Sequence, residues 1–207
     1  NPTGTVYSPD VLLELADIFP DKWILVDEAF IQFLSDYEER TLVNTERIRR
    51  NLLVFHSLTK FYAIPGIRLG CVIGHPETIA LLRKNKEPWT VNGIAEKTAS
   101  LLIDCLDYED QLKRLIEKEK KRFFTRLGQL EGLTLLGSSA NFFLAQWTAT
   151  TDLDDLLRIL LSNGLHVRDC RNFRLMENNY FRFAIRRAAD NEHLITQVTR
   201  SIKKLGK

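Results

Sequence analysis

The chain has 207 residues, of which 44% are hydrophobic and 27% charged, a composition close to that of ordinary globular proteins. Because 29 Lys and Arg residues nearly balance 27 Asp and Glu residues, the formal charge of +2 argues against binding to nucleic acid or to an acidic membrane surface. The apolar runs are far too short to span a bilayer, so no membrane segment is predicted. The three cysteines are widely spaced without a CxxC pair, which favours a cytoplasmic location and no zinc site.

The chain opens on the turn-like sequence Asn1-Pro2-Thr3-Gly4, with no element before it to turn from. We therefore expect a substantial segment to precede residue 1 in the complete protein. Ser8-Pro9-Asp10 then predicts the start of a helix, followed by apolar residues at helical spacing.

Three short apolar runs predict buried strands of a parallel sheet, at residues 23–30, 51–55 and 69–74. Helical patterns separate the first two runs, so this part of the chain is predicted to be α/β. In open α/β sheets, ligands bind beyond the carboxyl ends of the strands. Asp27 and the segment from His56 to Lys60 both fall there, so we expect them to converge on one site.

The second half of the chain has a different order of predicted helices and strands. Residues 93–130 predict a long amphipathic helix with a break at residues 107–110, and the charged run at 113–122 is interpreted as its solvated face. Further strands and helices are then predicted, with Asn163-Gly164 as a helix cap: strands at 133–136, 141–147, 165–170 and 180–185, and helices at 152–162 and 191–205. This pattern indicates a small α+β domain.

Residues 57–70, SLTKFYAIPGIRLG, hold the most informative chemistry. A lysine directly after a buried strand is costly unless its charge is used, and desolvation makes its amine a nucleophile toward an aldehyde. Ser57 and Arg68 flank Lys60 and supply the neutral donor and the bidentate cation that a phosphate monoester needs. Pro65-Gly66 lets the chain turn back, so that Arg68 reaches the same pocket.

Asp27 completes this set, because a carboxylate at a strand end can pair with the protonated pyridine nitrogen of pyridoxal 5′-phosphate. Asn1 can donate from its amide to the phenolic oxygen of the same ring. Taken singly, a Ser-x-x-Lys spacing or an Asp-Glu pair after a strand is usually without function. The combination predicts that Lys60 is the catalytic residue and carries pyridoxal 5′-phosphate.

Three motifs, NPTG at residues 1–4, DEAF at 27–30 and Ser57-x2-Lys60-x7-Arg68, resemble the signature of the fold-type-I aminotransferases. The likeness runs through essentially the whole chain. It implies an α/β fold in which residues 1–92 are the remainder of a large domain that binds pyridoxal phosphate. Residues 93–207 would then form a connecting helix and a small α+β domain.

The same resemblance implies a role for each candidate residue of the cofactor site. Lys60 would be the Schiff-base lysine, Asp27 would face the pyridine nitrogen, and Asn1 would lie near the phenolic oxygen. Ser57 and Arg68 would bind the cofactor's phosphate. Family members are homodimers with sites at the subunit boundary, so a homodimer is also implied.

Within the family, the segments at residues 57–66, 88–92 and 181–186 favour a branch related to the histidinol-phosphate aminotransferases. This branch decarboxylates L-threonine O-3-phosphate in cobalamin biosynthesis. The resemblance implies that Arg168 and Arg182 hold the phosphate and the carboxylate of this small phosphorylated substrate. Phe30, where the aminotransferases commonly have tyrosine, favours the decarboxylase.

Each of these two arginines has another interpretation. Arg182 lies among aromatic residues of an alternating strand, which predicts either a buried functional side chain or an edge strand facing water. Arg168 lies next to Asp169, and this carboxylate can instead pair with a neighbour. Four further residues nearby are interpreted as surface charges: Arg171, Arg174, Arg186 and Arg187. Where the family usually has Pro-Gly after an Asn-aromatic pair, this chain reads Asn172-Phe173-Arg174-Leu175, so that Arg174 either contributes to the site or interferes with it.

Other candidates are weaker. His56 is interpreted as a satisfied histidine at a strand end, and Tyr62 either lines the pocket or packs in the core. Trp89 and Asn92 predict a turn before the long helix. Two alternatives to the decarboxylase remain at this stage: a histidinol-phosphate aminotransferase, and an inactive fragment that serves as an assembly domain.

Overall fold

The computed structural model describes residues 1–44, 48–177 and 179–205. The chain divides into two compact units. We call Val6–Asp110 the Lys60 unit, and Asn1–Thr5 together with Gln111–Lys207 the Arg182 unit.

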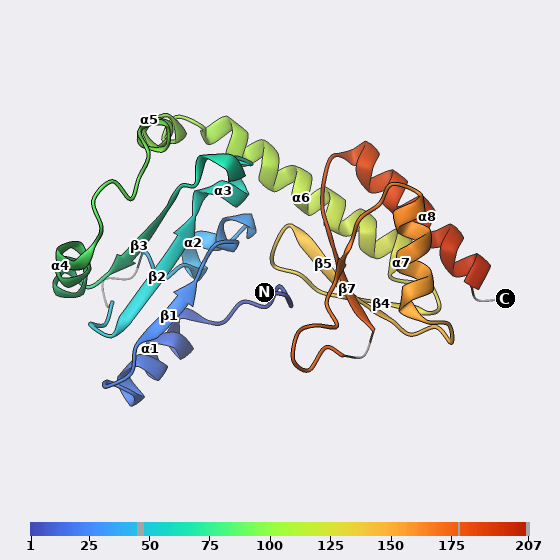
Figure 1. The fold of residues 1–207 in the computed structure, drawn as a ribbon, viewed down its shortest axis with the longest axis horizontal. Helices are drawn as coiled ribbons and strands as arrows, with labels where there is room; N and C mark the ends of the chain where they lie inside the picture. The colour runs from blue at the N-terminus through green and yellow to red at the C-terminus, as the bar shows by residue number, and fades with distance from the viewer. Residues whose placement is uncertain (45–47, 178, 206–207) are drawn as a thin grey trace. The chain divides into compact units, whose positions relative to one another are not determined.

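The described part of the Lys60 unit contains a sheet in the order β1-β2-β3 (Figure 1), formed by Ile24–Asp27, Leu52–Ser57 and Gly70–Gly74. β1 and β2 are parallel, as predicted, but β3 is antiparallel to β2. The prediction of a parallel third strand is wrong because the connection holds no element long enough to carry the chain back along the sheet. It contains α3 (Leu58–Phe61) and the 3-10 helix η2 (Pro65–Ile67), each about one turn long.

Helix α1 (Pro9–Ile18) begins where Ser8-Pro9 predicts it and helps to cover one face of this sheet. Ala16 packs there with Leu42, Leu52 and Val54 in a buried core. On the opposite face Leu25 is 62% exposed, so the prediction of strands buried on both faces is wrong for the described residues. Apolar residues at Phe55 and Val72 of the neighbouring strands lie on this same open face, at 39% and 37% exposure.

The remaining helices of this unit are short. The 3-10 helix η1 (Ile31–Phe33) and α2 (Tyr37–Arg40) lie between β1 and β2, and α4 (Pro76–Asn85) and α5 (Gly93–Leu102) follow β3. The next helix is α6 (Leu106–Leu127).

The long helix predicted over residues 93–130 is therefore two helices. The break lies at residues 103–105, where Cys105 N donates to Leu102 O at 3.2 Å. The interpretation of residues 107–110 as the break is wrong, because they form the first turn of α6. Acidic Asp107 and Glu109 suit that place, since negative side chains stabilise a helix at its amino end.

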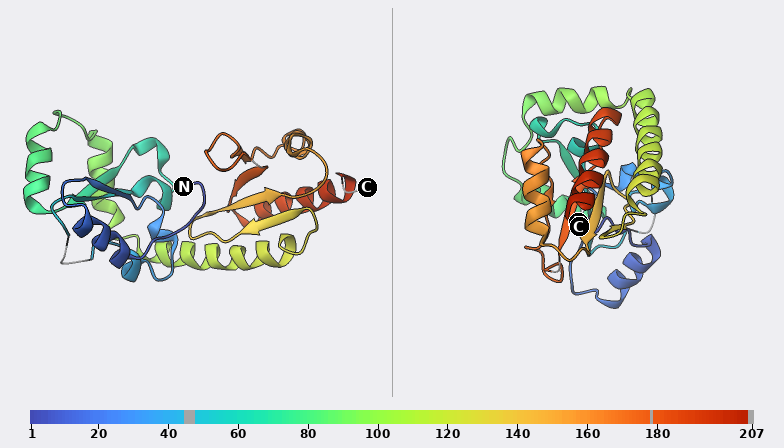
Figure 2. Two further views of the ribbon diagram at one scale, coloured as in Figure 1. Left: turned by 90° about the horizontal axis from the view of Figure 1, so that it is seen from below. Right: turned by 90° about the vertical axis from the view of Figure 1, so that its right-hand side faces the viewer.

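The Arg182 unit contains an antiparallel sheet in the order β4-β5-β7-β6 within the described residues. These strands are β4 (Leu133–Leu136), β5 (Phe142–Trp147), β6 (Arg168–Asp169) and β7 (Tyr180–Ala184). The strand predicted at residues 165–170 is therefore much shorter in the structure. Helices α7 (Leu153–Ser162) and α8 (Ala188–Leu205) lie side by side (Figure 2). Gly164 has a φ of +76°, which confirms the predicted cap of α7.

Aromatic rings form the core between α6 and this sheet. The ring of Phe123 lies 5.6 Å from that of Phe143 and 5.2 Å from that of Phe183, centroid to centroid. One turn earlier on α6, Glu119 is only 1% exposed. The interpretation of residues 113–122 as a solvated face is therefore wrong at this position.

Glu119 is buried because it has polar partners, one on α8 and one on α6 itself. Its Oε2 accepts a hydrogen bond from Nδ2 of Asn191 at 2.8 Å, and Arg122 donates to the same carboxylate at 3.2 Å. Asn191 in turn accepts from the backbone N of Arg186 at 2.8 Å, just after β7. Because buried polar groups require such partners, this network fixes the end of β7 against α6 and α8.

Candidate active site

Two strand ends meet at one edge of the Lys60 unit. In the parallel register, Asp27 of β1 lies opposite Phe55 of β2, and Ser57 ends β2 two residues later. Helix α3 begins at the next residue and carries Lys60. The carboxyl ends of parallel strands lie at the same edge of a sheet, so the structure brings Asp27, Ser57 and Lys60 to one side of this unit.

Lys60 projects from a well-anchored turn. Its neighbours Thr59 and Phe61 are buried, whereas Lys60 itself is exposed. The desolvation expected for a lysine directly after a buried strand is therefore not found at Lys60 within the described residues. No hydrogen bond or ion pair joins the Lys60 amine to any residue that the structure describes, so the amine is accessible for reaction with an aldehyde.

Two tyrosines, Tyr62 and Tyr108, hold this turn in place through hydrogen bonds. Tyr108 Oη donates to the carbonyl oxygen of Phe61 at 3.0 Å, and Tyr62 Oη donates to Glu109. Burial and the adjacent Glu109 carboxylate raise the pKa of Tyr62. The Tyr62 ring also packs against Phe61 at 5.3 Å, so its role in the structure is core packing. These contacts position α3, and therefore Lys60, against the first turn of α6.

The chain turns back after α3, as Pro65-Gly66 predicts. Ser57 pairs with Gly70 in the antiparallel register, and Arg68 lies two residues before that pair. Arg68 has left-handed backbone angles, φ 60° and ψ 55°, and its Nη1 donates to Pro65 O at 2.8 Å. A Cβ at Gly70 would lie 2.7 Å from the carbonyl oxygen of His56, so this close return requires glycine.

The two acids of the Asp27-Glu28 pair lie in different environments. Asp27 is exposed, and its Oδ1 accepts from the backbone N of Ala29 at 2.9 Å. Glu28 is buried and accepts three hydrogen bonds: from Thr41 Oγ1 at 2.6 Å, from Leu42 N at 2.8 Å and from His56 Nε2 at 2.8 Å. His56 is thus the satisfied strand-end histidine that the sequence predicts. Glu28 holds together the strand ends that carry Asp27 and Ser57.

Replacing Glu28 with glutamine is expected to lower the free energy of unfolding by about 1–3 kcal/mol, because an amide NH2 then faces a buried donor. Burial raises the pKa of Glu28, but the hydrogen bonds from His56, Leu42 and Thr41 outweigh it, so this pKa lies below its ordinary value of 4.5. A lowered folded-state pKa adds stability above the unfolded-state pKa, and this stability is lost as pH falls through the folded-state pKa.

Urea denaturation near neutral pH and at about pH 3 measures this difference. The advantage of the wild type over Glu28→Gln should shrink at the acidic pH. Glu39→Gln, an exposed carboxylate of the same unit, is the matched control and should change little at either pH. Equal stability of Glu28→Gln and wild type near neutral pH would contradict the structural role of Glu28.

Arg182 lies on β7, which is an inner strand between β5 and β6. The alternative of an edge strand facing water is therefore wrong. The half-buried guanidinium donates from Nη1 to Oδ1 of Asn1 and lies 4.4 Å above the ring of Phe142. Because the Asn1 oxygen is used in this way, its amide NH2 remains the group that can donate to a ligand.

Arg168 of β6 lies directly opposite Arg182 in the antiparallel register. It is exposed, its Nη2 donates to Oδ1 of Asn172 at 3.0 Å, and its guanidinium lies 5.5 Å from the ring of Phe173. Asp169 pairs with its neighbour Arg171 at 2.7 Å, which is the pairing with a neighbour that the sequence allows. Two like charges in directly opposite positions destabilise a sheet, and a bound anion relieves that repulsion.

Arg171 is not the surface charge that the sequence suggested. Its side chain is 29% exposed and forms ion pairs with Asp154 and Asp169. Arg186 does lie on the surface, next to Asp190. Arg174 is likewise exposed.

These donors match the chemistry of pyridoxal 5′-phosphate. In the Lys60 unit an unpaired amine, an exposed carboxylate, a hydroxyl and a guanidinium gather at one sheet edge, from Lys60, Asp27, Ser57 and Arg68. An aldehyde, a pyridine nitrogen and a phosphate require this set. In the Arg182 unit the structure brings Asn1, Arg182 and Arg168 together. That both groups line a single site stays a prediction.

The chain belongs to the aminotransferase class I and II family, which residues 1–198 match. Members of this family are enzymes that depend on pyridoxal phosphate, and the fold is that of the fold-type-I enzymes. The helices that the structure describes include none long and apolar enough to cross a membrane.

Three relatives illustrate the likeness. The chain is 33% identical to the threonine-phosphate decarboxylase of Salmonella typhimurium, over 94% of this chain and 53% of that protein. It superposes on a histidinol-phosphate aminotransferase from Clostridium acetobutylicum with a TM-score of 0.90 and 28% identity, over 99% of this chain and 62% of the other. It superposes on an L-threonine-O-3-phosphate decarboxylase from Porphyromonas gingivalis with a TM-score of 0.82 and 25% identity, over 98% of this chain and 62% of the other. The chain thus spans about half the length of the curated relative.

Sequence reasoning missed several residues that shape these sites. The sequence indicates Glu28 only as part of an acidic pair, although an acid and a histidine at the ends of two neighbouring predicted strands are a detectable signal for a buried bridge. Phe142 under Arg182 follows from strand register, which the sequence does not specify. The contact of Asn172 with Arg168 depends on the shape of a loop, for which the sequence carried no signal.

Proposed function

We propose that the complete protein decarboxylates L-threonine O-3-phosphate to 1-amino-2-propanol O-2-phosphate, with pyridoxal 5′-phosphate bound through Lys60. The observation that carries this proposal is the placement of Arg168 directly opposite Arg182 on neighbouring strands. A substrate that bears both a carboxylate and a phosphate supplies one anion for each guanidinium. The similarity to named threonine-phosphate decarboxylases supports the same assignment.

Bound pyridoxal phosphate supplies an electron sink for the bond that breaks at the substrate's Cα. Asp27 keeps the pyridine nitrogen protonated by presenting a carboxylate to it. Ser57 and Arg68 hold the cofactor's phosphate with one hydroxyl and one bidentate cation. Lys60, once its amine is free, donates the proton that replaces carbon dioxide at Cα.

Arg168 and Arg182 determine which reaction occurs, because they orient the substrate. Arg182 takes the carboxylate and Arg168 the phosphate. Such positioning contributes up to roughly 7–11 kcal/mol in favourable intramolecular cases. An interaction that is equally strong before and during carbon dioxide loss does not speed that step. The half-buried Arg182 would therefore act by orienting the carboxylate rather than by binding it tightly.

The alternative is a histidinol-phosphate aminotransferase, which the TM-score of 0.90 to such an enzyme favours. Histidinol phosphate has no carboxylate, so both arginines would then bind its phosphate. Phe30 argues against this function, because its ring packs beside Phe33 and has no hydroxyl that could bond the cofactor.

Product analysis separates the two reactions. Incubated with L-threonine O-3-phosphate and pyridoxal phosphate, but without any 2-oxo acid, the complete protein is expected to release one carbon dioxide per substrate, because decarboxylation needs no amino acceptor. Carbon dioxide release and the phosphorylated amino alcohol are measured together. Transfer of the amino group of histidinol phosphate to 2-oxoglutarate, with no gas from threonine phosphate, would overturn the decarboxylase and support the aminotransferase.

A further inference from the structure

The hydrogen-bond and ring partners of Arg168 are neutral, and its charge interacts more weakly with the Asp169 carboxylate, whose pKa is lowered mainly by Arg171. Its guanidinium donates to the amide oxygen of Asn172 at 3.0 Å and lies 5.5 Å from the ring centre of Phe173. It forms no ion pair with a carboxylate among the residues that the structure describes. Amides and aromatic rings orient a guanidinium without cancelling its charge. The positive charge of Arg168 therefore remains for a ligand.

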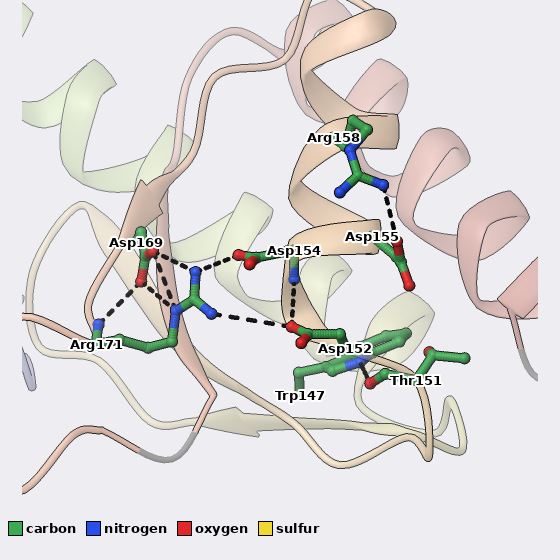
Figure 3. Close-up of polar contacts among 8 residues, drawn as sticks. All are labelled: Trp147, Thr151, Asp152, Asp154, Asp155, Arg158, Asp169 and Arg171. Atoms are coloured by element: carbon green, nitrogen blue, oxygen red, sulfur yellow. Dashed lines mark hydrogen bonds and ion pairs between the residues drawn. The ribbon is translucent and has the colours of Figure 1, made fainter.

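Arg171, in the same turn, shows the opposite arrangement (Figure 3). Its Nη2 donates to Asp169 Oδ2 at 2.7 Å and to Asp154, and its Nη1 lies 3.9 Å from Asp152. The carboxylates of Asp169 and Asp154 raise the pKa of Arg171 and offset its charge. Because Asp152 caps α7, Arg171 fastens the turn to the start of that helix. This arginine is structural.

The turn itself is fixed by its backbone. Cys170 N donates to Tyr180 O at 2.9 Å, which ties the turn to β7, and Phe173 N donates to Cys170 O at 3.0 Å, which closes it. Side chains of successive strand residues point to opposite faces, so Asp169 and Arg168 diverge. Arg171 follows Asp169 toward α7, whereas Asn172 returns to Arg168.

An aspartate at position 172 would hold Arg168 more strongly than asparagine, because charge-assisted hydrogen bonds are about twice as strong as neutral ones. It would also cancel the charge that a phosphate needs. Asparagine offers an oxygen in the same place without that charge. Arg182 follows the same rule, since its partners are the amide of Asn1 and the ring of Phe142.

We propose that Asn172 and Phe173 are positioning residues, which aim the Arg168 guanidinium at the phosphate of the substrate while leaving its charge intact. This inference rests on the proposed role of Arg168 in binding that phosphate. It makes Asn172 a determinant of affinity for doubly anionic substrates rather than a catalytic residue.

The test compares Asn172→Asp with wild type in the complete protein loaded with pyridoxal phosphate. Two quantities are measured: kcat and KM for L-threonine O-3-phosphate, and the Kd for inorganic phosphate by calorimetry. For Asn172→Asp we expect KM and Kd to rise about tenfold or more, and the rise in KM to exceed any fall in kcat. Arg168→Ala gives the loss expected when the guanidinium is absent.

Gln129→Glu is the matched control, since it adds the same charge at an exposed position of the same unit. It should leave KM and Kd at wild-type values. Phe173→Leu, which removes the ring, should raise Kd about two- to fivefold, whereas Phe173→Tyr should behave as wild type. Melting temperatures of all variants report whether they fold.

Inorganic phosphate makes the outcomes separable. If the wild type does not turn over threonine phosphate but Asn172→Asp still weakens phosphate binding, the proposed function fails and the positioning role stands. The positioning role is overturned if folded Asn172→Asp binds phosphate as the wild type does. It is also overturned if Gln129→Glu weakens binding equally, or if the wild type and Arg168→Ala bind phosphate alike.

Discussion

Replacing Lys60 with alanine is expected to lower kcat of the complete protein by about 10³-fold or more, because both the attachment of the cofactor and the proton donor at Cα are removed. The side chain is exposed and makes no bond to the described residues, so the melting temperature should change little. The measurement is carbon dioxide release from threonine phosphate, with a parallel visible spectrum of the bound cofactor. The spectrum should lose the band that the lysine-bound form gives.

Two controls sharpen this result. Lys60→Arg keeps the positive charge but has no amine that can be deprotonated, so it should fail as alanine does. Lys84→Ala removes an exposed lysine of α4 and should retain wild-type activity. Activity of Lys60→Ala within about tenfold of wild type would exclude Lys60 as the reactive amine.

Asp27→Asn is expected to lower kcat by about 10²–10³-fold, as when one preorganised electrostatic group is removed from an active site. Asparagine keeps an Oδ1 that accepts from Ala29 N, so the local turn should survive. The change removes the charge that would keep the pyridine nitrogen protonated. Steady-state kinetics together with the melting temperature measure both parts of this expectation.

Asp21→Asn, an exposed carboxylate before β1, is the matched control and should leave kcat unchanged. A kcat of Asp27→Asn within about threefold of wild type would contradict the pairing of Asp27 with the cofactor ring. A large loss of stability in Asp27→Asn would instead show that Asp27 has a structural role.

The sequence carried most of what depends on local chemistry. The helix start at Ser8-Pro9 and the glycine cap at Gly164 are short-range signals, and the structure confirms both. The turn at Pro65-Gly66 was predictable for the same reason. It returns the chain so that Gly70 pairs with Ser57.

What the sequence did not predict depends on contacts between distant residues. A charged run does not reveal that Glu119 is buried, because its partner Asn191 lies on another helix. Nor does an apolar run distinguish a parallel from an antiparallel β3, since both can be built from the same residues. The sequence also does not show which arginine is available to a ligand. Arg171 forms ion pairs with Asp154 and Asp169, and Arg168 does not.

Borohydride reduction of the complete protein loaded with pyridoxal phosphate, followed by peptide mapping, tests the assignment of Lys60 most directly. Reduction fixes the cofactor covalently to whichever amine holds it. The expected result is a single labelled peptide that contains Lys60 within SLTKFYAIPGIR. A label on another lysine, or a loaded protein that takes up no label, would contradict the assignment of Lys60 as the residue that carries the cofactor.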